Sequence, residues 1–255
     1  MPAEIHLFRC RSDNYGVLLH DSDSGATAAI DAPEAAPIEA ALKTTGWKLT
    51  DILVTHHHAD HTDGIEALKE KYKCRVVAPV AEASKIPAVD ETIREGDKVK
   101  VGTLSANVIE TPGHTLGHIA YWFHADKLAF VGDTLFSIGC GRVIEGTPEQ
   151  MWRSLVKLRD LPNDTEFYCG HEYTAANIKF ALTIEPNNEA LVARDAQAKQ
   201  QISRNEATIP VTIGEEKEAN PFLRADLPAV AAGIGMAGKP AAQVFAEIRA
   251  RKNKF

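Results

Sequence analysis

The feature that most constrains this chain is a run of histidines and aspartates that follows directly on an apolar segment. Residues 51–55, Asp-Ile-Leu-Val-Thr, predict a buried strand, and residues 56–61 then hold five side chains with imidazole or carboxylate donors. Such donors suit zinc, iron and manganese, whereas a cluster without thiolates disfavours copper(I) and iron–sulfur centres. The sequence therefore predicts a divalent-metal site at the end of a strand.

The spacing within the run indicates more than one ion. In an extended loop His56 and His58 can face the same side while His57 points to the other, so His57 is expected outside the ligand set. Asp60 and His61 then serve a neighbouring position. Because one ion needs three or four protein ligands, this oversupply predicts two ions that share a bridging ligand, about 3.5 to 4 Å apart.

Further ligands must come from elsewhere in the chain. Three candidates follow Gly-containing turns at the ends of predicted strands, where the backbone can approach an ion closely: His114, Asp133 and His171. A structural zinc site is a weak alternative, because such sites are closed by four ligands with thiolates prominent. For Asp31 two interpretations stay open, an orienting partner of a ligating histidine or a turn-initiating residue before Pro33.

Composition excludes several classes of function. The chain has 255 residues, is 44% apolar and carries a net charge of −7, which fits a compact protein without a broad electrostatic hold on nucleic acid or anionic lipid. It contains no signal-like start and no run of 18 apolar residues, so no membrane association is expected. Four scattered cysteines predict free thiols in a reducing compartment and a cytoplasmic protein.

The pattern of predicted elements changes near Gly170. Before it, strands and helices are intermixed, and Thr147, Pro148 and Gln150 form a helix start with a capping box. After it, residues 174–184, 189–205 and 240–252 are helical in pattern, with 229–238 a loop or weak helix. We therefore expect an α/β domain over residues 1–170 and a helical domain over residues 171–255.

These motifs, taken in order, resemble a known family. The patterns Thr-His-x-His-x-Asp-His, Gly-His-Thr, Gly-Asp-Thr and Gly-His-Glu are similar to those of the metallo-β-lactamase superfamily, whose fold is an αββα sandwich of two mixed sheets flanked by helices. Within it the chain resembles the glyoxalase II, or hydroxyacylglutathione hydrolase, family over nearly its whole length, including residues 139–146, 169–174, 220–224 and 249–255.

The resemblance implies a role for each motif residue. His56, His58 and His114 would hold the first metal, Asp60, His61 and His171 the second, and Asp133 would bridge them. The glutathione-binding surface would comprise a further set of four residues, Arg142, Tyr173, Arg249 and Lys252. Ile144 departs from the pattern, since some members carry an aromatic residue there, and a contact to glutathione is expected to be missing.

The basic C-terminus agrees with an anionic substrate. Arg249, Arg251, Lys252 and Lys254 form the strongest local excess of positive charge in an acidic chain. Glutathione carries two carboxylates, which such a cluster can attract and fix. A solvated basic face is the alternative, and Arg249 and Lys252 are the favoured contacts.

The implied activity is hydrolysis of S-(2-hydroxyacyl)glutathione thioesters, such as S-D-lactoylglutathione to D-lactate and glutathione, the second step of methylglyoxal detoxification. A hydroxide bridging two divalent ions, Zn²⁺ in the first place and Fe or Mn otherwise, would attack the thioester carbonyl. The enzyme is expected to act as a monomer. The main competing reaction on this scaffold is a glutathione persulfide dioxygenase with a single iron, and a metal-dependent binding or sensing module is the non-enzymatic alternative. A β-lactamase and a nuclease are disfavoured, the first because of His61 and the second by the acidic composition.

Overall fold

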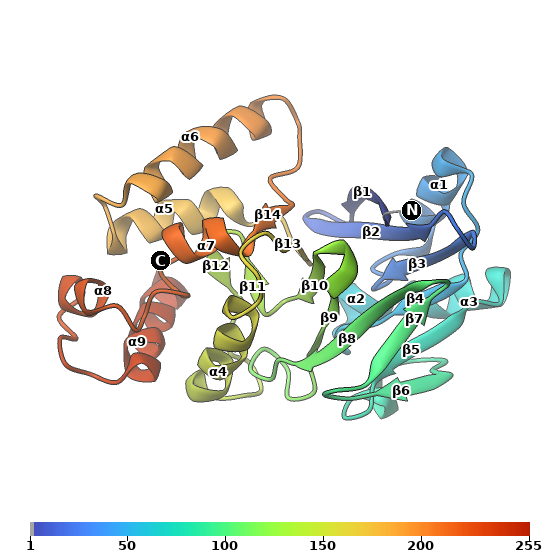
Figure 1. The fold of residues 1–255 in the computed structure, drawn as a ribbon, viewed down its shortest axis with the longest axis horizontal. Coiled ribbons are helices and arrows are strands. Elements are labelled where there is room, and N and C mark those ends of the chain that lie inside the picture. The colour runs from blue at the N-terminus through green and yellow to red at the C-terminus, as the bar shows by residue number, and fades with distance from the viewer. Residues whose placement is uncertain (1–2) are drawn as a thin grey trace. The chain divides into compact units, whose positions relative to one another are not determined.

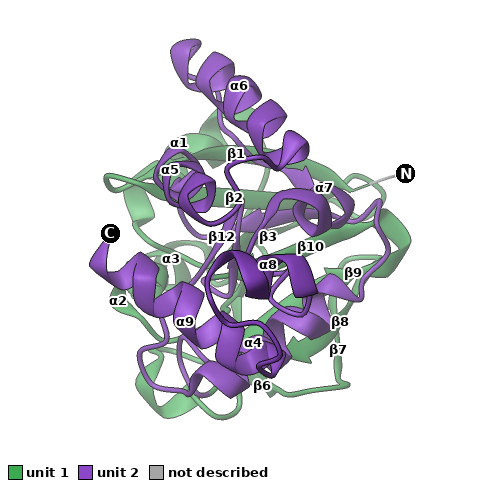
Figure 2. Cartoon of the chain, turned by 90° about the vertical axis from the view of Figure 1, so that its left-hand side faces the viewer, with its two compact units in different colours: residues 1–110, 117–132 green, residues 111–116, 133–255 purple. Residues whose placement is uncertain are grey.

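A computed structural model describes residues 3–255, and the chain forms two compact units. Unit 1 comprises the chain up to Glu110 together with Gly117–Gly132, and unit 2 comprises Thr111–Leu116 and Asp133–Phe255. Figure 1 follows the elements in chain order, and Figure 2 distinguishes the two units by colour. Unit 1 is discontinuous in sequence, because residues 111–116 belong to unit 2 although the chain on both sides belongs to unit 1.

The first sheet of unit 1 is mixed. Its strand order is β1-β2-β3-β4-β5-β6, with antiparallel pairing from β1 to β3 and parallel pairing from β3 to β6. The antiparallel part is the meander that the sequence predicts, and the parallel strands are buried runs such as Ile52–Leu53. The strands are β1 Glu4–Cys10, β2 Asn14–Asp21, β3 Ala26–Ile30, β4 Asp51–Leu53, β5 Arg75–Pro79 and β6 Glu91–Ile93.

Two helices cover one face of this sheet. Helix α1, Ala35–Thr45, contacts β1 and β2, and helix α3, Ile65–Tyr72, contacts β5. Their apolar sides pack with the sheet into one core that includes Ile38, Leu68 and Ile52. Helix α1 ends where the sequence predicts, at Gly46 in the left-handed conformation that glycine adopts without strain. Short helical turns follow β4 and β5, namely α2 Ala59–Thr62 and η1 Ala83–Lys85.

The second group of strands in unit 1 is antiparallel and packs on the other face of the first sheet. It runs β7-β8-β9-β10, and the hydroxyl of Tyr121 in β9 donates a hydrogen bond of 2.7 Å to the carbonyl of Val54 after β4. Unit 1 therefore has a helix layer and two strand layers. The remaining elements of unit 1 are β7 Lys98–Val101, β8 Leu104–Glu110, β9 Ile119–Phe123, η2 His124–Asp126 and β10 Leu128–Gly132.

Unit 2 is largely helical. Helices α5, α6 and α7 pack around Ile138, Ile178 and Leu191, and an edge-to-face contact of the Phe222 and Phe245 rings joins the loop after α7 to α9. Helix α4 starts with the predicted capping box of Thr147 and Gln150. The helices are α4 Pro148–Arg159, α5 Thr174–Ile184, α6 Glu189–Ser203, α7 Ile213–Ala219, α8 Pro228–Gly233 and α9 Ala241–Lys254. The strands are β11 Leu135–Phe136, β12 Gly139–Cys140, β13 Glu166–Cys169 and β14 Val211–Thr212.

Most predicted elements are confirmed to within a few residues, and the elements that the sequence does not reveal are short. Helix α7 escapes the periodicity argument because seven residues give barely two turns, although Thr212 and Glu215 form a complete capping box at its start. The hairpin of β11 and β12 has two residues in each strand, which is too few for an alternating pattern. Sequence periodicity therefore locates the scaffold and misses the connections that refine it.

The buried carboxylate of Asp21 links the two strand layers of unit 1, and it generates a testable prediction. It accepts hydrogen bonds from the Thr103 backbone N–H at 2.6 Å, the Thr103 hydroxyl at 2.9 Å and the Ser24 hydroxyl at 2.5 Å. Burial opposes ionisation, but these bonds outweigh it and hold the pKa of Asp21 well below its usual range. We expect Asp21→Ala to lower the free energy of unfolding by about 2 kcal/mol at pH 7.

The pH dependence checks the assigned cause. Because the folded pKa of Asp21 lies below its unfolded value, its contribution is present above pH about 4 and is lost as the pH falls through the folded pKa. Urea unfolding at pH 7, 5 and 3 should therefore show the difference between wild type and Asp21→Ala shrinking at the lowest pH. The exposed neighbour Asp23 is the control, with an expected effect within about 0.5 kcal/mol for Asp23→Ala. A difference that stays constant with pH would contradict the prediction.

Candidate metal centre

Unit 1 gathers four candidate ligands in one short segment after β4. His56 is fully buried, and its Nε2 lies 3.2 Å from Nδ1 of His58, the residue that caps α2. His61 follows within α2, with its ring centroid 4.2 Å from that of His56 and its Nε2 3.7 Å from the Asp60 carboxylate. The single turn of α2 thus brings Asp60 and His61 back beside the histidines that precede it.

A buried carboxylate sets the proton positions on two of these rings. Asp31 accepts hydrogen bonds from the Thr55 backbone N–H at 2.7 Å and from the Thr55 hydroxyl at 2.8 Å, and its Oδ2 lies 2.7 Å from Nδ1 of His61. Since a carboxylate only accepts, Nδ1 of His61 carries the proton and Nε2 keeps its lone pair. The Thr55 hydroxyl, having donated to Asp31, accepts at 3.0 Å from Nδ1 of His56. Nε2 of His56 therefore also presents a lone pair.

His57 is bonded to a buried carboxylate, Glu82, and its exclusion from the ligand set stays a prediction. Its backbone N–H and its Nδ1 both bond the Glu82 carboxylate, at 2.7 and 2.8 Å. Glu82 is 2% exposed and also accepts the Gly117 backbone N–H at 2.8 Å, so it ties the histidine segment to the residue before His118. The His118 ring in turn stacks on His56 at 4.7 Å. Nothing in the sequence marks Glu82, because it lies 25 residues from His57 outside any motif.

Unit 2 brings the other three candidates together. The Asp133 carboxylate, 6% exposed as a residue, has one oxygen 3.4 Å from Nε2 of His114 and 3.3 Å from Nε2 of His171. Nδ1 of His114 donates to the backbone carbonyl of Arg142 at 2.9 Å, which leaves the lone pair on Nε2. Two imidazole nitrogens therefore approach one carboxylate oxygen from two segments, the arrangement expected of a shared metal ligand.

Within each unit, imidazole and carboxylate donors lie close to one another, and hydrogen bonds orient His56 and His61 in unit 1 and His114 in unit 2. This donor chemistry suits a divalent ion of the zinc, iron or manganese type. Among the described residues, four groups of three imidazole or carboxylate side chains are close enough together to hold an ion. The residues present therefore fit a divalent metal, and the prediction of a divalent-metal site is confirmed at that level.

The predicted glutathione contacts lie in unit 2, and their roles stay predictions. The Tyr173 ring stacks on His171 with centroids 4.9 Å apart and 38% of the residue exposed, and the Arg142 side chain is exposed. Arg249 is buried and donates at 2.9 Å to the carbonyl of Cys140. Lys252, one turn further along α9, donates at 2.8 Å to the carbonyl of Ala176 in α5. The structure thus brings α9 against β12 and the first turn of α5, next to Tyr173.

Glycines allow the backbone to pass close to the candidate ligands and to the side chains that orient them. Gly132, which precedes Asp133, has φ +47°, and a Cβ there would lie 2.6 Å from the Thr55 hydroxyl and 2.7 Å from Nε2 of His118. Gly141 packs so tightly on the carbonyl of Asp133 that a Cβ would overlap it. The Gly-Asp-Thr motif is therefore a steric requirement as well as a predicted ligand position.

Comparison with known proteins assigns the class. Residues 22–171 match the family model described as the metallo-beta-lactamase superfamily, and residues 172–255 match that of the hydroxyacylglutathione hydrolase C-terminus. The crystal structure of ETHE1 from Myxococcus xanthus is similar with a TM-score of 0.71 and 27% identity over 99% of this chain and 92% of that one. The fold is that of the metallo-β-lactamase superfamily, mixed sheets with helices, followed by a helical C-terminal part, as the sequence predicts.

Full-length relatives narrow the class to one family. The chain is 64% identical to the hydroxyacylglutathione hydrolase of Rhodopseudomonas palustris strain HaA2 and 62% identical to that of Nitrobacter hamburgensis, each time over at least 99% of both chains. This chain belongs to the hydroxyacylglutathione hydrolase family. Within residues 3–255, no helix is both long and apolar enough to cross a membrane.

Substitution of Gly132 tests the steric requirement next to Asp133. We expect Gly132→Ala to lower the free energy of unfolding by about 2 to 4 kcal/mol, because the left-handed backbone and the collision with Thr55 and His118 both add cost. The content of bound divalent metal should fall as well, since Thr55 orients His56. The measurements are thermal unfolding and metal content per chain.

Gly25→Ala is the matched control for that substitution. Gly25 also has a positive φ, +77°, but a Cβ there meets nothing within 4 Å. It should cost about 1 kcal/mol from the backbone alone and leave the metal content unchanged. Equal effects of the two substitutions would show that the collision at Gly132 contributes nothing.

Proposed function

We propose that this chain hydrolyses S-(2-hydroxyacyl)glutathione thioesters, with S-D-lactoylglutathione as substrate and D-lactate and glutathione as products. The observation that carries the proposal is the pair of donor sets, each oriented by its own hydrogen bonds, in a chain 58 to 64% identical over its full length to proteins named hydroxyacylglutathione hydrolase. The reaction would be the second step of methylglyoxal detoxification.

The metal part of the proposal assigns two ions per chain, with Zn²⁺ the first candidate. His56, His58 and His114 would hold the first, Asp60, His61 and His171 the second, and Asp133 would bridge. The approach of His114 and His171 to the same Asp133 oxygen, at 3.4 and 3.3 Å, supports the bridging role. Bound divalent ions lower the pKa of a coordinated water toward neutrality and polarise a carbonyl oxygen, which is the chemistry that thioester hydrolysis needs.

The residues of the chain would orient the donors and the substrate. Asp31 and the Arg142 carbonyl accept hydrogen bonds from Nδ1 of His61 and of His114, which keeps the proton on Nδ1. Nε2 of each ring therefore stays available to bind an ion. The leaving thiolate needs little help from an acid, because a free thiol has a pKa of about 8.5. The substrate-binding role of Arg142, Tyr173, Arg249 and Lys252 is supported by the exposed Tyr173 ring beside His171 and by the cationic end of α9.

The proposal extends to organisation and location. We propose a catalytic domain over residues 1–170 and a helical glutathione-binding domain over 171–255, a division supported by the two family matches that meet at residues 171 and 172. The active species would be a single chain, because both donor sets and the glutathione contacts come from one sequence. Four free, buried thiols support a cytoplasmic location.

Metal-dependent thiol release tests the reaction. Purified protein should release thiol from S-D-lactoylglutathione, lose this activity on chelation and regain it when Zn²⁺ is restored. Metal analysis should give about two ions per chain, and Asp60→Ala or His171→Ala should leave about one and reduce kcat/KM about 100-fold or more.

The same experiment separates the competing functions. Absence of thiol release from protein that holds two ions would overturn the proposed substrate. A single iron that Asp60→Ala does not disturb, with oxygen consumed on a glutathione persulfide, would indicate the dioxygenase instead. Tight metal and ligand binding without turnover would indicate a binding or sensing module.

The charge of Lys252 provides a second test of substrate binding. Burial, and next to it the positive charge of Arg249, lower the pKa of Lys252 to about 8, from an ordinary value above 10. Lys252 therefore loses its charge as the pH rises from 7 to 9. If it binds a glutathione carboxylate, KM for the thioester should rise over this interval by up to about 10-fold while kcat changes less.

Two substitutions isolate that effect. Lys252→Arg keeps its charge throughout, because a guanidinium does not titrate below pH 12, and should flatten the rise in KM. Lys254→Arg, at an exposed position on the same helix, should leave the wild-type profile intact. A KM that rises equally in all three proteins would exclude Lys252 as the titrating contact.

A further inference from the structure

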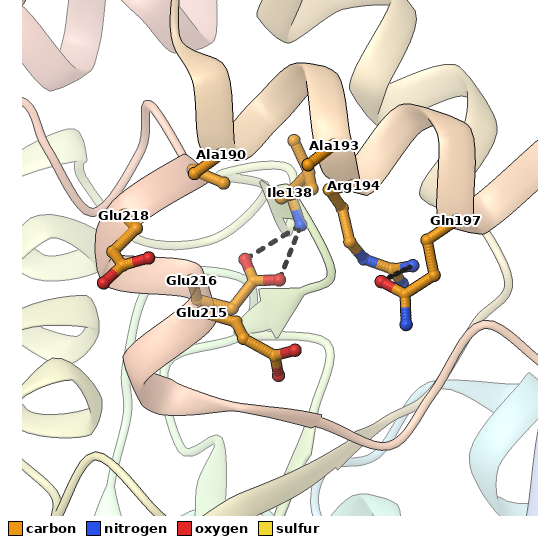
Figure 3. A pocket seen from close by; sticks show the side chains of 9 residues that line it. Ile138, Ala190, Ala193, Arg194, Gln197, Glu215, Glu216 and Glu218 are labelled. Carbon is orange, nitrogen blue, oxygen red and sulfur yellow. Dashed lines mark hydrogen bonds between the residues drawn. The ribbon is translucent and has the colours of Figure 1, made fainter.

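Helices α6 and α7 bury two opposite charges that the proposed reaction does not use. Arg194 is 5% exposed and Glu216 is fully buried. Both line a cavity of about 220 Å³, and Figure 3 shows Glu216 turned toward the backbone nitrogen of Ile138 and Arg194 extended toward Gln197. Burying ionisable groups costs free energy unless hydrogen bonds compensate, so their partners indicate what they are for.

Arg194 connects two loops of unit 2. Its Nη2 donates to the hydroxyl of Ser137 at 3.1 Å and to the backbone carbonyl of Thr208 at 2.6 Å. Its Nη1 donates to Gln197 and Gln201 on its own helix, at 3.3 and 3.1 Å, which fixes the direction of the guanidinium. The rigid, planar guanidinium of Arg194 therefore sets the spacing between the Ser137 turn and the Thr208 loop.

Glu216 holds the same turn from the other side. Its carboxylate accepts the Ile138 backbone N–H at 2.9 and 3.1 Å and the Asn220 side-chain amide at 2.7 Å. The Asn220 amide also donates to the carbonyl of Gly139 at 3.0 Å. Ile138 has φ +54°, an unfavourable conformation for a β-branched residue, so this turn needs such support to persist.

Both of these segments lead to proposed metal ligands. The Ser137 turn lies four residues after Asp133. The Thr208 hydroxyl donates to the Glu172 carboxylate at 2.8 Å, and Glu172 directly follows His171. Arg194 is thus one or two hydrogen bonds from the two loops whose ligands, Asp133 and His171, lie 3.3 Å apart.

We infer that Arg194 and Glu216 are positioning residues for the second metal, which hold the Asp133 and His171 segments at the separation that a bound ion requires. The inference rests on the proposed two-metal function and adds a task for α6 and α7 that is distinct from glutathione binding. Burial raises the pKa of Glu216 to about 7, against the opposing effects of the Ile138 amide, Asn220 and Arg194.

The test is the affinity for each of two zinc ions, measured by competition with a chromophoric chelator in wild type and variants. Arg194→Met keeps the aliphatic stem and removes the fork, and it should weaken the second ion by about 10- to 100-fold while the first changes by less than about threefold. Arg194→Lys should recover only part of the loss, because one ammonium cannot reproduce the four bonds that the two guanidinium nitrogens donate. Glu216→Gln, nearly identical in shape, should weaken the second ion by about 10-fold.

Arg159→Met is the matched control. Arg159 also lies in unit 2, donates to the carbonyl of Leu223 at 2.8 Å and pairs with Asp226, but none of these partners belongs to the two ligand loops. It should leave both zinc affinities within about threefold of wild type.

The outcomes separate this inference from the function on which it rests. Wild-type binding of both ions, with the second unchanged in Arg194→Met and Glu216→Gln or with both weakened equally, would overturn the positioning role alone. Failure of wild type to bind two ions would overturn the proposed two-metal function and this inference with it. Should Arg194→Met not fold, Glu216→Gln decides by the same criteria.

Discussion

The segment of unit 1 that carries the candidate ligands, residues 56–61, depends on hydrogen bonds to the buried carboxylate of Asp31. This carboxylate accepts hydrogen bonds from the backbone N–H and the hydroxyl of Thr55, just after β4, and from Nδ1 of His61. One side chain therefore fixes the exit of the strand, the tautomer of His61 and, through Thr55, that of His56. Donors prepared in this way lose little conformational freedom when an ion binds, because the orientation is set by folding.

Unit 2 prepares its donors by the same principle with different groups. The Arg142 carbonyl orients His114. One oxygen of the Asp133 carboxylate lies close to Nε2 of two histidines, His114 and His171, which come from separate loops. The turn after Asp133 and the Thr208 segment beside His171 are held in turn by a hydrogen-bonded network from α6 and α7. A helical region that belongs to the hydroxyacylglutathione hydrolase C-terminus family is thus connected, within its own unit, to the segments that carry the candidate ligands Asp133 and His171.

The family shares its scaffold with proteins of other names, so function depends on the site and its supports. A β-lactamase structure, BLEG-1, covers 86% of this chain with a TM-score of 0.66 at 20% identity, which reflects the fold alone. This chain carries seven candidate donors together with the basic end of α9. These features are local, and they sit on strand ends and helix termini that the common scaffold provides.

The ligand candidates, the main strands and helices and the family could all be predicted from the amino-acid sequence. Those features leave local signals: donors after a buried strand, the Thr147 capping box, and motifs in a fixed order. The hydrogen-bond partners could not be predicted and are known from the folded structure, such as Glu82 for His57 and Glu216 for Ile138, which are 25 and 78 residues apart. A single buried carboxylate leaves no periodic pattern in the sequence. Its partner is the donor that the packed chain brings within hydrogen-bond distance, so such pairs form only when the chain folds.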